Sequence, residues 1–277
     1  MPKNQKKTVT QLKTKLDKRK ICICITLVAA ALMLIYEFFL SEVLLGGLGN
    51  GSLKSGIDMI VTRALGSVVF LTILAYVGYN VLKPLKSPFL RSVLFAIPAF
   101  VVAVNNLPIY PLATGIAGVT SPLWQVLLLA LECLMVGLFE EVCFRGVIFL
   151  GFLEKRRATT KDRFVAIILS SAVFGAVHLI NIFLGASPGA VLMQIGYSFL
   201  IGAMCSVVLM KTANLWLCVL IHAIFNFCGA LVPRCGEGTI WEPLTVTLTV
   251  IIALATTVYM TVAFFRMKKS ECDRIYK

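Results

Sequence analysis

Charged residues are scarce in this sequence, and their scarcity excludes an ordinary soluble domain. Only 14% of the 277 residues are Asp, Glu, Lys or Arg, against about 25% in soluble globular proteins. Hydrophobic residues make up 59% of the chain and fall in long blocks, which is typical of a polytopic membrane protein. The net charge of +13 lies mostly between and beyond these blocks, so it indicates membrane topology and not nucleic-acid binding.

Several hydrolytic signatures are also missing. The chain has two histidines and no His-Glu-x-x-His run, which excludes a zinc protease helix of that kind. None of its aspartates lies in the middle of an apolar block, which excludes an intramembrane aspartate pair. The nine cysteines show no Cys-x-x-Cys spacing and are interpreted as packing residues. The run from Gly185 to Gly189 spells G-x-S-x-G, but Ser187 followed by Pro188 is better explained as a helix cap.

The apolar blocks predict eight transmembrane helices. With the N-terminus in the cytoplasm, every basic link falls on the cytoplasmic side and both uncharged links fall outside, as the positive-inside rule requires. The predicted fold class is therefore an all-α, polytopic membrane helical bundle with both termini cytoplasmic. The predicted spans are 21–45, 57–82, 92–106, 123–150, 164–184, 190–210, 215–231 and 244–265.

Three regions are expected along the chain. A basic cytoplasmic arm covers 1–20, a transmembrane domain covers 21–265, and a basic cytoplasmic tail covers 266–277. Small residues at four-residue spacing in the sixth span predict a close-packing face for a neighbouring helix. These small residues are Ser198, Gly202 and Ser206.

Two adjacent carboxylates and a guanidinium lie inside the fourth predicted span. An ionisable residue at membrane depth is by default a hypothesis about function. Glu141 and Arg145 are four residues apart, so they share a helix face and can form an ion pair. Glu140 points about 100° away from Glu141 and is free to face a different wall of a cavity.

Both histidines lie in predicted spans as well, His178 in the fifth and His222 in the seventh. Phe174 shares a helix face with His178, and Asn226 shares one with His222. Together with Glu140, these groups match the needs of water-activated acyl cleavage. That reaction requires a base for the water, a proton shuttle and donors for the developing oxyanion.

Proton or ion transport accounts for the same groups equally well, because Glu, His and Arg at membrane depth also build proton relays. Four further charges inside predicted spans keep a transporter in consideration. Interfacial placement or pairing between helices, such as Arg63 with Glu37, is the preferred explanation for these charges. The four are Glu37, Glu42, Arg63 and Glu132.

The three motifs resemble those of the CPBP (CAAX protease and bacteriocin-processing) intramembrane endopeptidases. This group includes the eukaryotic Ras-converting CAAX endopeptidase. The resemblance covers about 123–230, the expected protease core, and implies a helical fold around a water-filled cavity open to the cytoplasm. The motifs are Glu140-Glu141-x-x-x-Arg145, Phe174-x-x-x-His178 and His222-x-x-x-Asn226, in this order on separate predicted spans.

The resemblance implies an intramembrane protease in the cell membrane that hydrolyses a peptide bond. Its partners would be membrane lipids and a peptide or small membrane-protein substrate, with no nucleic acid. Glu140 would activate the water and His178 would assist it. His222 and Asn226 would hold the oxyanion.

Glu141 with Arg145 would fix the first motif helix in the same scheme. No cofactor is assigned. Members of the family are described both as metalloproteases and as glutamate proteases, and two histidines with a glutamate would suffice for a catalytic zinc ion. Oxyanion donation by His222 needs no metal, and the metal-free scheme is preferred. The remaining alternative within the family is a catalytically silent bacteriocin self-immunity protein.

Overall fold

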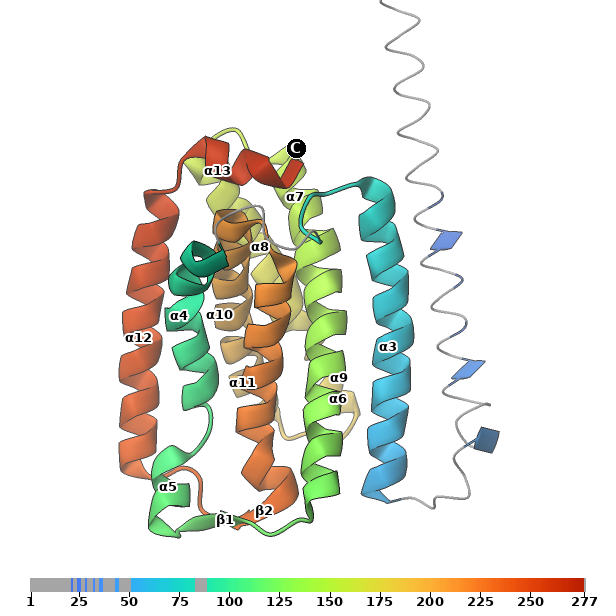
Figure 1. The fold of residues 1–277 in the computed structure, drawn as a ribbon, viewed down its shortest axis with the longest axis vertical. Helices are drawn as coiled ribbons and strands as arrows, with labels where there is room; N and C mark the ends of the chain where they lie inside the picture. Colours follow the sequence, from blue (N-terminus) through green and yellow to red (C-terminus); the bar gives the residue numbers. More distant parts are fainter. Residues whose placement is uncertain are drawn as a thin grey trace, which may run out of the picture.

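The computed structural model describes residues 51–82 and 89–276, together with single positions between 21 and 44. The predicted basic arm, Glu37 and Glu42 lie outside the described residues. Long helices stand side by side along the long axis of the molecule and form one bundle (Figure 1). They are α3 (Ser52–Val77), α4 (Phe89–Asn105), α6 (Leu123–Glu141), α8 (Thr160–Val177), α10 (Pro188–Thr212), α11 (Leu215–Cys235) and α12 (Pro243–Phe265).

Five helical stretches in the described part of the chain are long and apolar enough to cross a membrane. Four of them lie in α3, α10, α11 and α12, and the fifth is Thr160–Phe183, which combines α8 with the short α9 (Ile180–Phe183). The apolar helix α4 is shorter. The molecule is therefore a helical, multi-pass membrane protein, as predicted. The count of eight spans and the cytoplasmic termini stay predictions.

The fourth predicted span is one continuous helix whose winding changes along its length. α6 passes directly into the π-helix η3 (Val142–Phe149) and then into α7 (Leu150–Lys155). The helix therefore continues beyond the predicted end at 150. A π-helix bonds each residue to the fifth one along, and such segments are frequent at functional sites. Hydropathy does not distinguish a π-helix from an α-helix, so the sequence did not predict this segment.

The fifth predicted span, 164–184, is interrupted at His178. Its helix α8 begins earlier than predicted because Thr159 and Asp162 form a capping box, in which each side chain accepts a hydrogen bond from the other residue's backbone N–H. The helix ends at Val177, and the chain turns into α9 after His178. One histidine of the motifs therefore lies at a helix end and not within a continuous span.

Side-chain caps explain where the next two helices begin. The Ser187 hydroxyl accepts a hydrogen bond from the Ala190 N–H at 3.3 Å, and Pro188 occupies the first turn of α10. This confirms the interpretation of the G-x-S-x-G letters as a helix cap. The Asn214 side chain likewise accepts a hydrogen bond from the Leu217 N–H at 3.2 Å and begins α11.

Glycines let two pairs of helices approach each other closely. A Cβ on Gly137 of α6 would lie 3.0 Å from the backbone nitrogen of Ala223 on α11. On α10, the predicted small-residue face is buried, and a Cβ on Gly202 would lie 3.2 Å from the Ser171 hydroxyl of α8. These contacts bring α6 against α11 and α8 against α10, so residues from four helices meet in the interior.

Short elements close the two ends of the bundle. At one end, α5 (Ile109–Thr114) leads to β1 (Ala117–Val119), which pairs antiparallel with β2 (Gly236–Gly238) in a ladder that the sequence did not predict. At the opposite end, α13 (Lys269–Asp273) and η4 (Arg274–Tyr276) lie across the helices (Figure 1).

Candidate active site

The paired carboxylates lie at the junction of α6 and η3, deep within the bundle. Glu141 is fully buried, and its Oε1 lies 3.0 Å from Nη1 of Arg145, whose side chain is 1% exposed. The guanidinium carbon of Arg145 also lies 4.2 Å from the centre of the Phe174 ring on α8. The arginine is thus held by a carboxylate of its own helix and by an aromatic face of the next one.

The space around the Arg145 guanidinium depends on Gly202, which has no side chain. A Cβ on Gly202 would lie 3.0 Å from Nη2 of Arg145 and 3.4 Å from the Phe174 ring. The Ser171 hydroxyl is also buried in this region, and it has no hydrogen-bond partner among the described residues. Gly202 therefore provides the space that the guanidinium and the ring occupy. The sequence predicted Gly202 as a packing residue and did not connect it with the site.

His222 connects the two carboxylates. It lies on α11 and is 4% exposed. Its Nδ1 lies 2.7 Å from Oε1 of Glu141, and its Nε2 lies 3.4 Å from Oε2 of Glu140. The second distance is too long for a good hydrogen bond, so the contact with Glu141 is the one that fixes the ring.

The two neighbouring glutamates therefore face different nitrogens of the His222 imidazole. Successive helical side chains point about 100° apart, which lets Glu140 and Glu141 reach opposite sides of the His222 ring. Their surroundings also differ, because the Glu141 side chain is fully buried whereas the Glu140 side chain is 17% exposed. Glu140 is therefore the more accessible carboxylate of the two.

His178 lies near this cluster without touching the carboxylates. Its Nδ1 lies 2.9 Å from the backbone oxygen of Phe174. A carbonyl oxygen only accepts, so Nδ1 carries the proton and Nε2 keeps its lone pair when the ring is neutral. The Phe174 ring lies edge-on to both imidazoles, with its centroid 5.3 Å from that of His178 and 5.8 Å from that of His222. Phe174 is thus central to the site, where the sequence noted only its spacing from His178.

Asn226 lies one helical turn beyond His222 on α11 and is half-buried. Its side chain makes no hydrogen bond within the part of the chain that the structure describes. Of the six predicted site residues, the structure brings four into one contact network. The four are Glu140, Glu141, Arg145 and His222. Asn226 lies on α11 with His222, and His178 lies at the end of α8, but neither side chain joins the network directly.

Side chains that could hold a metal ion also lie at this network. In the described residues, the one set of three close ligand atoms comes from Glu141, Cys205 and Cys218, all buried and within 4.8 Å of one another. Glu141 already contacts both Arg145 and His222, and a guanidinium beside a cation site is repulsive. The two histidines and Glu140, which would suffice for the zinc alternative, do not form such a set among the described residues. Neither group establishes a cofactor.

The remaining intramembrane charges have structural partners where the structure describes them. Glu132 on α6 and Arg234 on α11 form a two-bonded ion pair, with Nη1 to Oε2 at 2.5 Å and Nη2 to Oε1 at 3.2 Å. The guanidinium carbon of Arg63 lies 4.9 Å from the centre of the Phe139 ring. The suggested partner of Arg63, Glu37, lies outside the described residues.

Comparison with known families agrees with the motifs. Residues 122–228 match the family model described as "Type II CAAX prenyl endopeptidase Rce1-like". The matched stretch contains all three motifs and every residue of the network described above. Searches of curated proteins and of solved structures found no match.

Proposed function

We propose that this chain, a multi-pass membrane protein that belongs to the CAAX protease family, is an intramembrane endopeptidase in which Glu140 activates the attacking water. The observation that carries the proposal is the position of His222 between Glu140 and Glu141. An imidazole held by one buried carboxylate and facing a second, more accessible one is a suitable arrangement for acid–base chemistry on a bound water.

The approach of Glu140 to His222 favours a shared water. Their facing atoms are 3.4 Å apart, which is too close for a water between them, but a single water beside them can contact both at ordinary hydrogen-bond distances. Glu140 takes a proton from this water while the oxygen of the water attacks the carbonyl carbon of the scissile peptide bond. The proton then passes to the leaving amine, and the products are a carboxylate and a free amino terminus.

His222 is the proposed donor to the oxyanion. Its Nδ1–H donates to Glu141 at 2.7 Å, which fixes the direction of the ring. When the ring is protonated, Nε2–H is directed toward Glu140 and the water, where the carbonyl oxygen gains negative charge. Asn226, one turn away, supplies a second donor through its side-chain amide. Donors that are already oriented contribute most in a site with little water.

Glu141 and Arg145 position the site and do not react. Their ion pair is almost fully buried, and removing one partner of such a pair leaves an uncompensated charge. The pair therefore holds both the junction of α6 with η3 and the His222 ring in one arrangement.

His178 assists the water through its free Nε2. Because Nδ1 donates its hydrogen to the Phe174 carbonyl, Nε2 is left as an acceptor in the neutral ring. The scheme needs no metal, although zinc remains the alternative within the family. Basic links at the end that carries α7 and α13 support a site that opens to the cytoplasm, and the substrate class is a membrane-associated peptide or small membrane protein.

The test is Glu140→Gln, which keeps the volume of the side chain and removes its basicity. In vesicles that contain a panel of membrane peptides, we expect this variant to lose cleavage by at least about a hundredfold, the usual contribution of a general base. The matched control is Glu237→Gln on β2, an exposed glutamate at the far end of the bundle, which should cleave as the wild type does. Unchanged cleavage by Glu140→Gln would refute the assignment of the base.

The same variant separates a protease from a self-immunity protein, and a flux assay tests for a transporter. A self-immunity protein keeps its cellular phenotype with Gln at position 140, whereas a protease loses it. A transporter requires a proton- or ion-coupled flux in liposomes. The pairing of Glu132 with Arg234 removes part of the reason for considering one.

A further inference from the structure

The end of α8 at His178 is held by contacts on both sides of the histidine. Three residues before it, Gly175 lies so close to α10 that a Cβ there would come 3.1 Å from the backbone oxygen of Ile195. Three residues after it, the Asn181 side-chain amide donates to Oε1 of Gln194 at 2.8 Å. Gln194 and Ile195 are consecutive residues of α10. One short stretch of α10 therefore contacts the chain both before and after His178.

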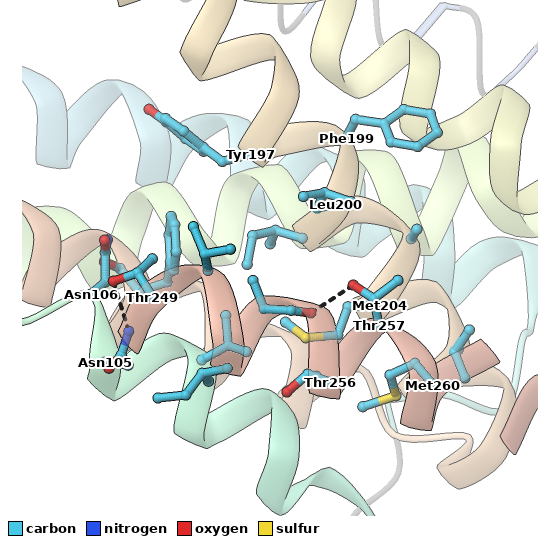
Figure 2. Close-up of a pocket in the computed structure, with 18 of the residues that line it drawn as sticks. Asn105, Asn106, Tyr197, Phe199, Leu200, Met204, Thr249, Thr256, Thr257 and Met260 are labelled. Atoms are coloured by element: carbon cyan, nitrogen blue, oxygen red, sulfur yellow. Dashed lines mark hydrogen bonds between the residues drawn. The ribbon is translucent and has the colours of Figure 1, made fainter. Parts of the chain in front are cut away.

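Gln194 continues the face of α10 that packs against α8. It lies four residues before Ser198 and eight before Gly202, and residues at this spacing form one stripe along a helix. A different face of α10 carries Leu200 and Met204, which line an apolar pocket beside α12 (Figure 2). The amide of Gln194 is thus directed to the end of α8 and not into this pocket.

The bond to Gln194 is the polar anchor of α9. None of the four residues of α9 is buried, and Phe183 is 88% exposed, so apolar packing does little to hold this segment against the bundle. The rest of α9 is apolar, which makes Asn181 its one side chain that can hydrogen-bond. The backbone oxygen of Asn181 also accepts from the Ala186 N–H at 2.9 Å. Through Asn181, the whole turn that follows His178 is tied to α10.

The position of this turn determines the direction of the His178 ring. His178 ends α8, and its carbonyl oxygen accepts from the Asn181 N–H at 3.0 Å. The bond from its Nδ1 to the Phe174 carbonyl spans the last turn of α8, so it requires that turn to stay helical. A helix end that loses its tertiary contacts opens locally. Without the anchor, the imidazole would lose the bond that leaves Nε2 as the acceptor.

We propose that Gln194 is a positioning residue for His178 and acts through the Asn181 amide. It holds the turn after the histidine in place, so that the imidazole keeps one tautomer and one direction. Amide side chains that bond across helices are typical of packed membrane helices. The consequence for catalysis rests on the proposed function, whereas the effect on the ring does not.

Histidine NMR tests the effect on the ring directly, because the chain has only two histidines. The full chain, with isotope-labelled nitrogen in its histidine rings, is placed in liposomes at about pH 8, above the usual histidine pKa of about 6.5. The variant His178→Ala identifies the signals of His178, and in the wild type we expect its Nδ1 to be protonated. Gln194→Met keeps the length of the side chain and removes the acceptor. We expect it to give a mixture of both tautomers at His178 and to leave the His222 signals unchanged.

A second variant removes the other partner of the same bond. Asn181→Leu should have the same effect on His178, and combining it with Gln194→Met should add nothing. The matched control is Gln125→Met, the same substitution at a half-buried glutamine of α6, which should leave both imidazoles as in the wild type. His178 signals that both variants leave unchanged would overturn the proposal. Changes of equal size at His222 would overturn it as well, because they would indicate a general loss of packing.

A cleavage assay separates this role from the proposed function. Gln194→Met should lower kcat several-fold without changing KM, and it should cause no further loss when His178→Ala is already present. An equal loss with and without His178→Ala would refute the positioning role. If the wild type cleaves no substrate, the proposed function fails, and the NMR result alone decides whether Gln194 positions the ring.

Discussion

The buried pair of Glu141 and Arg145 permits a quantitative test of how the site is held. The two side chains are 0% and 1% exposed and lie 3.0 Å apart. Glu141→Gln keeps the size of the side chain and an oxygen for His222 but leaves the guanidinium without a counter-charge. Breaking a buried pair in this way costs about 3 to 5 kcal/mol of unfolding free energy. Arg145→Met should cost the same or less, because His222 still faces the carboxylate.

The double variant separates charge from packing. With Gln at 141 and Met at 145, no buried charge is left unpaired, and the remaining cost is the partly unsatisfied amide, about 1 to 3 kcal/mol. The double-mutant cycle should therefore give a coupling energy of at least about 2 kcal/mol. Stability should return in the double variant while cleavage does not, because the carboxylate that orients His222 is absent.

The measurement is thermal or denaturant unfolding of the purified protein, followed by tryptophan fluorescence, with cleavage assayed in parallel. The pair Glu132–Arg234 is the control: its glutamate is 5% exposed but its arginine is 43% exposed, so solvent screens this pair more than the Glu141–Arg145 pair and its substitutions should cost less. If the effects of Glu141→Gln and Arg145→Met simply add, or if each costs less than the control substitutions, the two charges are not coupled as described and the reasoning fails.

Three further predictions concern packing, pH and metal. Gly137→Ala should destabilise the protein by about 1 to 3 kcal/mol, since its Cβ would meet the backbone of Ala223 at 3.0 Å; Gly151→Ala, with open space around it, should not. Burial raises the pKa of Glu271, but hydrogen bonds from Lys211 and from the backbone, with the nearby positive charges, outweigh this effect and leave the pKa lowered. This carboxylate therefore stabilises the docking of α13 above about pH 4.3, its unfolded value. Hydrogen exchange of α13 should increase as the pH falls through the lower folded value, and Glu271→Gln should remove this dependence. Chelators should leave cleavage unchanged; loss of cleavage that zinc alone restores would contradict the metal-free scheme.

The membrane-spanning architecture could be predicted because apolar length is a local property of the chain. From the second to the eighth, each predicted span overlaps a helix, and the cap at Ser187 was predicted from two adjacent residues. The π-helix η3 and the end of α8 at His178 could not be predicted, because both depend on bonding within the folded bundle. Hydropathy carries no information on either.

The residues of the site could be predicted from the sequence, but the contacts between helices that join them could not. Spacing predicted that Glu141 and Arg145 could pair, and the structure contains this pair. The contact of Glu141 with His222 joins residues 81 positions apart and depends on how closely α6 approaches α11 at Gly137. That approach is a property of two helices together, so no pattern in either one reveals it. The roles assigned to the six residues stay predictions until they are assayed.

The π-helical stretch η3 divides the continuous helix from α6 to α7 into two parts whose side chains differ in angular phase. On the α6 side, the chain presents its carboxylates to α11, and through η3 the same helix turns Arg145 toward α8. A uniform α-helix of this length would keep one angular relation between its two ends, and η3 resets that relation in the middle. The angle between the side chains of α7 and the two carboxylates therefore depends on the winding of η3 and not only on the number of residues between them.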